Sequence, residues 1–309
     1  MSDLARAESI LRAACGDRVR ARFPMAPLTT FRIGGPAALY LEAESEADLD
    51  AASEAIVTAD LPFVVIGKGS NLLVSDRGFG GLVLRLGRPY RWAARDGALL
   101  TAGGAMPLPA LAGVALRHGL GGLSFGVAIP ATVGGAVKMN AGAHAGDMAD
   151  VVASVEVYRL EGHRTGSIPA DAAGFSYRRS DLPVDSVITA ATMSLRPGDR
   201  TEIRLAMDEA REWRRRTQPL AEPNCGSVFK NPPQDHAARL IESAGLKGAR
   251  VGAAEVSRKH ANFIVADPGG SADDVRSLIA RIQDEVEARS GVRLEPEVHL
   301  VGEFDHAAG

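Results

Sequence analysis

Glycine is concentrated between Gly67 and Gly146, and this constrains the fold more than any other feature of the sequence. Glycine is used where the backbone must turn tightly or approach another group closely. We therefore expect a compact, turn-rich α/β unit over this stretch, with main chain lying close to something. The group that this main chain approaches can be a neighbouring element of the protein or a bound ligand.

The first motif in this stretch is Pro62-Phe-Val-Val-Ile-Gly-Lys-Gly-Ser-Asn71, an apolar strand that runs into glycines. Such a turn presents a concave row of N–H groups suited to a phosphate or pyrophosphate. A Walker loop needs Gly-Lys-Ser/Thr at its end, and a dinucleotide fingerprint needs a third glycine and a later acid, where this chain has Gly87-Arg88. The motif predicts a non-Rossmann anion site, or a tight turn with no ligand.

A second motif, Ala128 to Gly146, consists mainly of small residues. Small side chains allow main chain to lie against a flat ligand, to which Thr132 and Asn140 can offer hydrogen bonds. Close packing of helices or strands is the alternative interpretation.

Three further motifs carry polar groups: Tyr177-Arg-Arg-Ser180, Asn224 to Pro232, and Leu294 to Glu303. Each by itself is compatible with an ordinary surface or strand end. Together they offer a fixed cation, a hydroxyl proton donor and a carboxylate. These groups can act jointly on an enolate-like transition state.

The pattern of apolar residues predicts an α+β protein with its main domain boundary near residue 200. Before the boundary we expect strands at 38–42, 63–66, 81–86, 98–102, 151–158 and 186–195, and helices at 45–59, capped by Ser45, and 108–118. A charged helix over 201–216 is ended by prolines. After it we expect strands at 227–229, 262–265 and 297–301, and helices at 235–244 and 271–289.

Composition, cysteine spacing and apolar runs argue against several classes of protein. A net charge of −3 and 5% aromatic residues argue against a nucleic-acid partner. Cys15 and Cys225 fit no metal or disulfide spacing, so we expect a reducing compartment and no metal site. The first residues do not form a signal peptide, and no apolar run reaches the roughly 18 residues of a membrane span. We expect a cytoplasmic protein without membrane insertion.

At its motifs the sequence resembles the UDP-N-acetylenolpyruvoylglucosamine reductases, which are flavoenzymes of bacterial cell-wall precursor synthesis. The resemblance extends over nearly the whole chain, in the segments 29–35, 67–71, 129–135, 140–142, 177–178, 226–231 and 294–297. It implies a flavin-binding fold of the vanillyl-alcohol-oxidase type over 1–200, made of two α+β subdomains that meet near 67–70. It also implies a substrate-binding domain over 201–303 whose final strand returns to the flavin site.

The resemblance also implies the reaction. NADPH reduces bound FAD, and the reduced flavin reduces the enolpyruvyl group of UDP-N-acetylenolpyruvoylglucosamine to give UDP-N-acetylmuramate. The product serves peptidoglycan synthesis, and through it cell-wall biogenesis, cell shape and cell division. Ser227 resembles the proton donor of the family, and Glu297 and Arg178 resemble the pair that stabilises the enolic intermediate. We expect a monomer or a weak oligomer.

Further contacts carry over from the same motifs. A cation such as Lys230 can stabilise the serine alkoxide, and His260 is expected to be a core histidine. The residues expected to contact FAD are Gly67, Lys68, Gly69, Ser70, Asn71, Pro130, Thr132, Gly134, Gly135 and Gly142. The residues expected on the substrate side are Tyr177, Lys230 and Asn231.

The sequence departs from the family pattern in three places. Ala131 stands where the family has glycine, and His299 stands where it has arginine. Only 70 positions separate Ser227 from Glu297, as in the short subclass without the tyrosine-bearing loop over the substrate. Another residue must then cover the sugar nucleotide.

Two alternatives remain open from the sequence. Another flavin oxidoreductase of the same fold would keep the glycine motifs but lack the set formed by Arg178, Ser227 and Glu297. A non-catalytic nucleotide-sugar-binding protein would be colourless. A visible flavin spectrum separates this last alternative from the other two.

Overall fold

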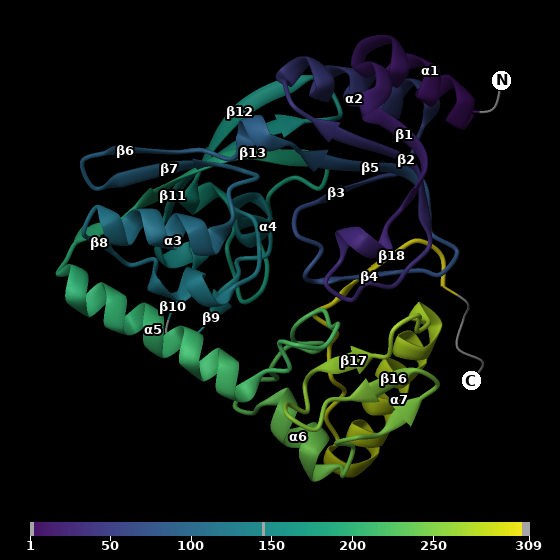
Figure 1. The fold of residues 1–309 in the computed structure, drawn as a ribbon, viewed down its shortest axis with the longest axis vertical. Coiled ribbons are helices and arrows are strands. Elements are labelled where there is room, and N and C mark those ends of the chain that lie inside the picture. Colours follow the sequence, from purple (N-terminus) through teal and green to yellow (C-terminus); the bar gives the residue numbers. More distant parts are fainter. Residues whose placement is uncertain (1–2, 144–145, 305–309) are drawn as a thin grey trace. The chain divides into compact units, whose positions relative to one another are not determined.

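The chain divides into two compact units in the computed structural model, which describes residues 3–143 and 146–304 (Figure 1). The first unit comprises residues 1–21, 39–68 and 81–214, and the second comprises 22–38, 69–80 and 215–309. Two short pieces of the N-terminal half therefore belong with the C-terminal hundred residues.

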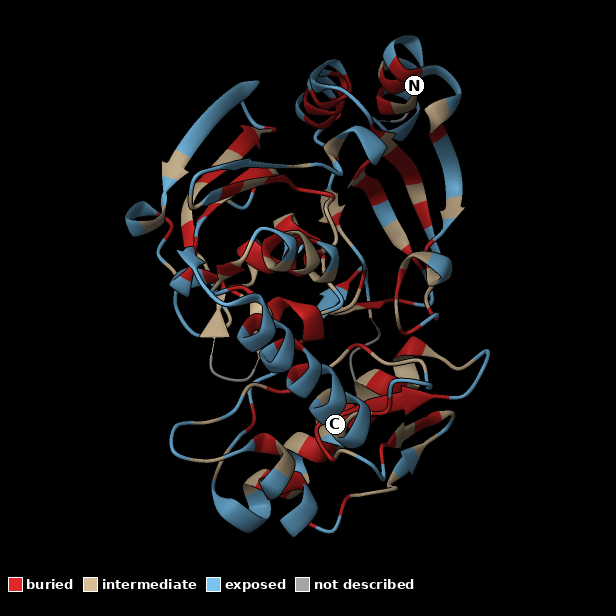
Figure 2. Ribbon diagram, turned by 60° about the vertical axis from the view of Figure 1, so that its left-hand side comes forward, coloured by how far each residue is buried: buried red, intermediate tan, exposed pale blue. Residues whose placement is uncertain are grey.

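A four-stranded sheet with two helices forms one part of the first unit. The strand order is β1 (Val19–Pro24), β2 (Pro36–Ala43), β5 (Phe79–Leu86) and β3 (Phe63–Ile66), and β3 is parallel to β5. Helices α1 (Asp3–Cys15) and α2 (Glu46–Ala59) lie together on this sheet (Figure 1). Each helix has a buried and an exposed side (Figure 2). Leu11, Leu49 and Leu82 are among the residues of their shared core.

An antiparallel five-stranded sheet forms the other part of the first unit. Its order is β12 (Arg164–Pro169), β11 (Val152–Arg159), β13 (Ser186–Ser194), β7 (Leu99–Gly103) and β6 (Ala93–Asp96). Helices α3 (Leu108–Arg117) and α4 (Val133–Lys138) contribute to its core. So does α5 (Arg200–Thr217), which buries Ile203, Met207 and Ala210 at helical spacing.

The second unit contains a small antiparallel sheet and a parallel strand pair. The sheet is β15 (Arg250–Val251), β16 (Ala254–Val256) and β17 (Ile264–Ala266), and its core includes residues of α6 (Ala237–Ser243) and α7 (Ala272–Ser290). The strand pair joins β4 (Leu72–Val74) to β18 (His299–Val301). The Asp76 carboxylate accepts hydrogen bonds from Ala272 N at 3.0 Å and Asp273 N at 3.1 Å. The segment 69–80 is thereby fixed to the first turn of α7.

The remaining elements are short. Two strand pairs lie in the first unit: β8 (Leu120–Gly121) with β14 (Arg196–Pro197), and β9 (Gly142–Ala143) with β10 (Gly146–Asp147). The 3₁₀ turns are η1 (Gly16–Arg18), η2 (Ala26–Leu28), η3 (Arg88–Tyr90), η4 (Ser124–Ala128), η5 (Met148–Asp150) and η6 (Ala170–Ala172).

Most of the expected elements are confirmed. Ser45 caps α2, because its hydroxyl accepts from Asp48 N at 3.3 Å, and Ser271 caps α7 in the same way at 3.0 Å from Asp273 N. The strand expected at 227–229 is wrong: this segment makes only a single bridge, between Phe229 and Pro296. The final strand is also shorter than expected, since β18 begins at His299.

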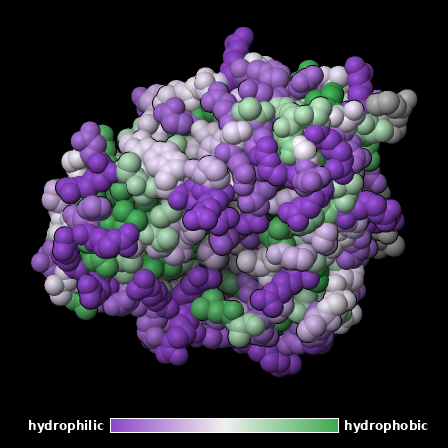
Figure 3. Space-filling view, turned by 45° about the horizontal axis from the view of Figure 1, so that its top comes forward, coloured by the Kyte–Doolittle hydropathy of each residue, from purple (hydrophilic) through white to green (hydrophobic). Residues whose placement is uncertain are grey.

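The surface shown in Figure 3 is largely hydrophilic, with apolar residues in small groups between hydrophilic ones. Within residues 3–143 and 146–304, no helix combines the length and the apolar character needed to cross a bilayer.

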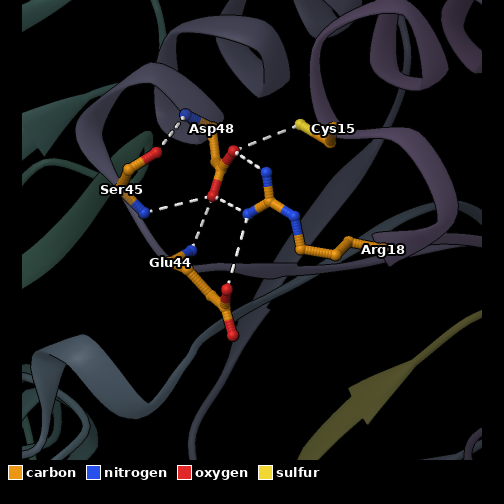
Figure 4. A network of polar contacts seen from close by, with 5 residues as sticks. All are labelled: Cys15, Arg18, Glu44, Ser45 and Asp48. Atoms are coloured by element: carbon orange, nitrogen blue, oxygen red, sulfur yellow. Dashed lines mark hydrogen bonds and ion pairs between the residues drawn. The ribbon is translucent and has the colours of Figure 1, made fainter.

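A buried carboxylate holds the start of α2 to the segment that follows α1 (Figure 4). Asp48 is 2% exposed, and it accepts hydrogen bonds from both terminal nitrogens of Arg18, from Glu44 N at 2.7 Å and from Ser45 N at 3.1 Å. Burial alone would raise the pKa of Asp48, but the hydrogen bonds from Arg18 and Glu44 N outweigh it and lower the pKa. Cys15 Sγ lies 3.5 Å from the same carboxylate. Burial and this carboxylate raise the pKa of the Cys15 thiol to about 11.

We predict that Asp48→Asn lowers the free energy of unfolding by about 2–4 kcal/mol at pH 7, because it leaves buried donors without their charged acceptor. The lowered pKa of Asp48 means that this stability is present above the unfolded value near ~3.9 and is lost as the pH falls through the folded value. Urea unfolding of wild type and variant should therefore give curves that converge below about pH 4. A difference that is equal at pH 7 and pH 3 would contradict the assignment.

Candidate functional site

The glycine turn after β3 has two positions where only glycine fits. A Cβ on Gly67 would lie 2.4 Å from Thr132 Oγ1, so Thr132 lies directly against the turn. Gly69 has φ +60°, and a Cβ there would lie 2.2 Å from Leu28 O. The division between the two units falls between Lys68 and Gly69.

This turn also offers hydrogen-bond donors. In the described parts of the chain, the main-chain N–H groups of Gly69 and Ser70 donate to no protein acceptor. Adjacent N–H groups around a left-handed residue form a cradle for an anion. The turn therefore fits a pyrophosphate, one of the two alternatives that its sequence leaves open, and binding of FAD there stays a prediction.

Thr132, expected to contact FAD, begins α4. Its hydroxyl accepts from Gly135 N at 3.3 Å, and the residue is 7% exposed. Gly134 packs on strands, since a Cβ there would lie 3.2 Å from both Gly104 O and Ile188 O. The structure thus brings Gly67, Thr132 and Gly135 to one place in the first unit.

Asn140 was expected to hydrogen-bond a flat ligand, but its side chain bonds the protein. Its side chain donates to Ser176 O at 2.9 Å and to Asp147 Oδ2 at 3.3 Å, and it accepts from Ala149 N at 2.9 Å. Asn140 is 2% exposed, both of its N–H donors are engaged within the protein, and its amide oxygen already accepts a main-chain hydrogen bond. The expectation that Asn140 hydrogen-bonds a flat ligand is therefore wrong.

Arg178 sits on a tight turn in the same unit. Ser176 and Arg179 exchange main-chain hydrogen bonds of 2.9 and 3.1 Å, which leaves Tyr177 and Arg178 at the tip. Arg178 has φ +58°, a backbone conformation that a residue with a side chain adopts only at a cost. Its guanidinium lies 5.1 Å from the Tyr177 ring centroid. Its Nη1 is 3.0 Å from where a Cβ on Gly142 would lie, so glycine at 142 leaves room for this side chain.

Ser227 and Glu297 lie on adjoining segments of the second unit. Glu297 N donates to Val228 O at 2.7 Å, and Lys230 N donates to Glu295 O at 2.9 Å. Both residues are partly exposed. A short antiparallel pairing thus holds the main chains of the two segments side by side.

The side-chain amides of two asparagines hydrogen-bond the main chain of the Ser227 and Glu297 segments. Neither of these contacts was predicted from the sequence. Asn262, 4% exposed, accepts from Phe229 N at 3.0 Å and donates to Phe229 O at 2.8 Å. Asn71, the last residue of the glycine turn, donates through Nδ2 to Glu297 O at 3.1 Å, and its own carbonyl accepts from His299 N at 3.0 Å. The turn is therefore bonded directly to the main chain of Glu297.

The predicted substrate-side residues of the second unit have protein partners. Lys230 Nζ lies 2.5 Å from Glu295 Oε1, so its charge is paired with a carboxylate. Asn231 Oδ1 accepts from Ala237 N at 3.1 Å at the start of α6.

Other titratable groups nearby are held in their neutral forms. Burial raises the pKa of the Cys225 thiol to about 12, with a contribution from the charge of Glu297, so this cysteine is not a nucleophile at neutral pH. Burial lowers the pKa of His260, whose Nδ1 accepts from Asn262 N at 3.2 Å. In the part of the chain that the structure describes, no three His, Cys, Asp or Glu side chains are grouped to hold a metal ion.

The α+β architecture and the glycine turn with open N–H groups fit an FAD-binding oxidoreductase, and the comparisons with known proteins assign the chain to that class. Residues 37–165 match the family model described as an FAD binding domain. Residues 218–301 match that of the UDP-N-acetylenolpyruvoylglucosamine reductase C-terminal domain. The chain belongs to the family of UDP-N-acetylenolpyruvoylglucosamine reductases.

Individual relatives support this family assignment. The chain is 48% identical over 304 residues to UDP-N-acetylenolpyruvoylglucosamine reductase 2 of Symbiobacterium thermophilum, covering 98% of each chain. It is 42% identical to the reductase of Synechocystis, covering 96% of this chain and 95% of that one. The crystal structure of the enzyme from Thermus caldophilus aligns with a TM-score of 0.82 at 38% identity, covering 92% of this chain and 99% of that one.

The resemblance seen in the sequence is thereby confirmed, and so is the expected fold class. The chain is an FAD-dependent reductase of peptidoglycan precursor synthesis. This identification replaces the two alternatives that the sequence left open, another flavin oxidoreductase and a non-catalytic binding protein.

We predict that Gly69→Ala weakens FAD binding by about tenfold or more, because alanine is strained at φ +60° and its Cβ meets Leu28 O. The flavin absorbance of the purified protein and an FAD titration of the apoprotein measure this. Gly80→Ala is the matched control, since Gly80 lies in the same segment and a Cβ there meets nothing within 4 Å. Wild-type affinity in Gly69→Ala would contradict an FAD site at this turn.

Proposed function

We propose that this chain reduces the enolpyruvyl group of UDP-N-acetylenolpyruvoylglucosamine with NADPH as hydride donor, using Ser227, Glu297 and Arg178. FAD, when bound, would supply the hydride-transfer chemistry between NADPH and the enolpyruvyl double bond. The observation that carries the proposal is the pairing of the Ser227 and Glu297 segments, with Asn262 and Asn71 holding them. A preorganised hydroxyl and carboxylate are what such a reduction needs from the protein.

Ser227 is the proposed proton donor. Hydride addition at the β-carbon leaves negative charge on the α-carbon and the carboxylate of the substrate. A serine hydroxyl is a weak acid, but a carbanion is far more basic, so a hydroxyl held in place can protonate it. The fixed segment around Val228 and Phe229 supplies this positioning.

Arg178 and Glu297 are proposed to polarise the carboxylate and stabilise the enolic intermediate. A guanidinium is a permanent cation with donors arranged for two-pronged contact with a carboxylate. The strained turn at Arg178 fits this role, because strain of this kind persists where the surroundings impose it. Glu297 contributes a carboxylic group whose main chain is fixed on both sides.

The binding residues are proposed from the same motifs. FAD would be held by the residues expected from the sequence, with Gly69 and Ser70 donating to its pyrophosphate. Tyr177, 51% exposed, would contact the substrate together with Lys230 and Asn231. Since Lys230 pairs with Glu295, we assign it to binding and not to the serine alkoxide.

The domain organisation and the cellular compartment are also proposed here. We propose a flavin-binding region over 1–200 and a substrate-binding domain over 201–303, and we propose the cytoplasm as the compartment because NADPH is supplied there. The short-subclass assignment and the monomeric or weakly oligomeric state stay predictions. No membrane or nucleic-acid partner is part of the proposal.

We predict that in Ser227→Ala NADPH still reduces the flavin, while reoxidation by the substrate slows by about 10²- to 10⁴-fold. Anaerobic stopped-flow absorbance measures the two half-reactions separately. Ser243→Ala, at an exposed serine of α6, is the control. Wild-type rates in both half-reactions would rule out Ser227 as the donor.

We predict that Arg178→Lys lowers turnover by about 10²-fold or more, because one ammonium group cannot reproduce a bidentate contact. Arg179→Lys is the matched control, since the Arg179 side chain is 70% exposed on the same turn and pairs with Asp181. Steady-state kinetics with varied substrate measures the effect. Equal turnover of both variants and wild type would refute the role of Arg178.

A further inference from the structure

We infer that Asn140 and Asp147 are positioning residues that fix the guanidinium of Arg178 for the reaction. The inference rests on the proposed function of Arg178 and names two residues that the sequence motifs do not assign to it. Neither side chain is proposed to touch substrate or flavin.

Asn140 fixes the main chain of the turn that carries Arg178. Its amide donates to Ser176 O, the carbonyl at the base of that turn, at 2.9 Å. Its other end accepts from Ala149 N at 2.9 Å, so one buried amide bonds two segments of the first unit. Asn140 itself has φ +40°, a conformation that asparagine tolerates better than most residues.

Asp147 lies beside the guanidinium. Gly142 and Asp147 are directly paired across the β9–β10 strands. A Cβ built on Gly142 would lie 2.6 Å from Asp147 Cβ and 3.0 Å from Arg178 Nη1, so both side chains border the same point. The absence of a side chain at Gly142 is what lets them approach.

The carboxylate of Asp147 is held by the amide of Asn140 and, in the capping box of η5, by the main chain of Asp150. Its Oδ2 accepts from Asn140 Nδ2 at 3.3 Å, while Oδ1 is buried and has no hydrogen-bond partner within the described chain. A buried carboxylate oxygen without a hydrogen bond is costly unless a positive charge lies near it. The guanidinium of Arg178 borders the same point beside Gly142, so its positive charge is the one we assign to balance this oxygen and to direct the side chain.

The two restraints act on different parts of Arg178. Asn140 restrains the strained backbone at φ +58°, and Asp147 restrains the direction of the side chain. A bidentate contact with a substrate carboxylate depends on both, because a misplacement of about 1 Å can cost 10²-fold in rate. Arg178 would therefore be prepared for the substrate before the substrate binds.

The test is the pair of half-reactions in holoenzyme carrying Asp147→Asn, which keeps the shape and removes the charge. We expect flavin reduction by NADPH to stay within about twofold of wild type, and reoxidation by UDP-N-acetylenolpyruvoylglucosamine to slow by about 10- to 100-fold. Asn140→Gly, which keeps the backbone conformation and removes the amide, should show the same asymmetry. Asp171→Asn, at an exposed carboxylate of the same unit, should match wild type.

A double variant sharpens the test. If Asp147 acts through Arg178, Asp147→Asn combined with Arg178→Lys should reoxidise no more slowly than Arg178→Lys alone. Unchanged reoxidation in Asp147→Asn, equal slowing of both half-reactions, or fully additive losses would each overturn the inference. Failure of the wild-type enzyme to be reoxidised by the substrate would overturn the proposed function instead.

Discussion

Hydrogen bonds from asparagine amides to irregular main chain are the interaction on which the candidate site depends. Asn262 pairs with both polar groups of Phe229, and Asn71 joins the glycine turn to Glu297. Asn140 joins the Arg178 turn to the segment at Ala149. These segments lack regular strand partners, so side-chain amides satisfy main-chain groups that would be costly to bury unpaired. Rigid placement of the proposed catalytic groups follows from this.

Glycine provides the complementary constraint, because it removes side chains where polar groups must come close. At Gly67 the neighbour is the Thr132 hydroxyl, and at Gly142 it is the Arg178 guanidinium. At Gly69 the constraint is the backbone conformation itself. The concentration of glycines in this chain therefore reflects close approach as well as turning.

Local signals in the sequence predicted many of the regular elements but not α1, β1 or β12. The capping serines at 45 and 271 and the apolar periodicity located α2 and α7, and the resemblance located the family. The strand expected at 227–229 was not found, because Asn262 takes the hydrogen bonds that a strand partner would make. The contact of Asn71 with Glu297 joins residues 226 positions apart, and no local pattern reports a pairing of that kind. Asn140 was assigned to a ligand because its residue type is right for one, while its burial is visible only in the fold.

The most direct measurement is a crystal structure of the FAD-loaded enzyme with bound UDP-N-acetylenolpyruvoylglucosamine. We predict that the Ser227 hydroxyl faces the α-carbon of the enolpyruvyl group while Arg178 makes a two-pronged contact with its carboxylate. We also predict that Asn140 and Asp147 keep their contacts with the Arg178 turn. A complex in which the enolpyruvyl group contacts neither Ser227 nor Arg178 would contradict the proposed roles of these two residues.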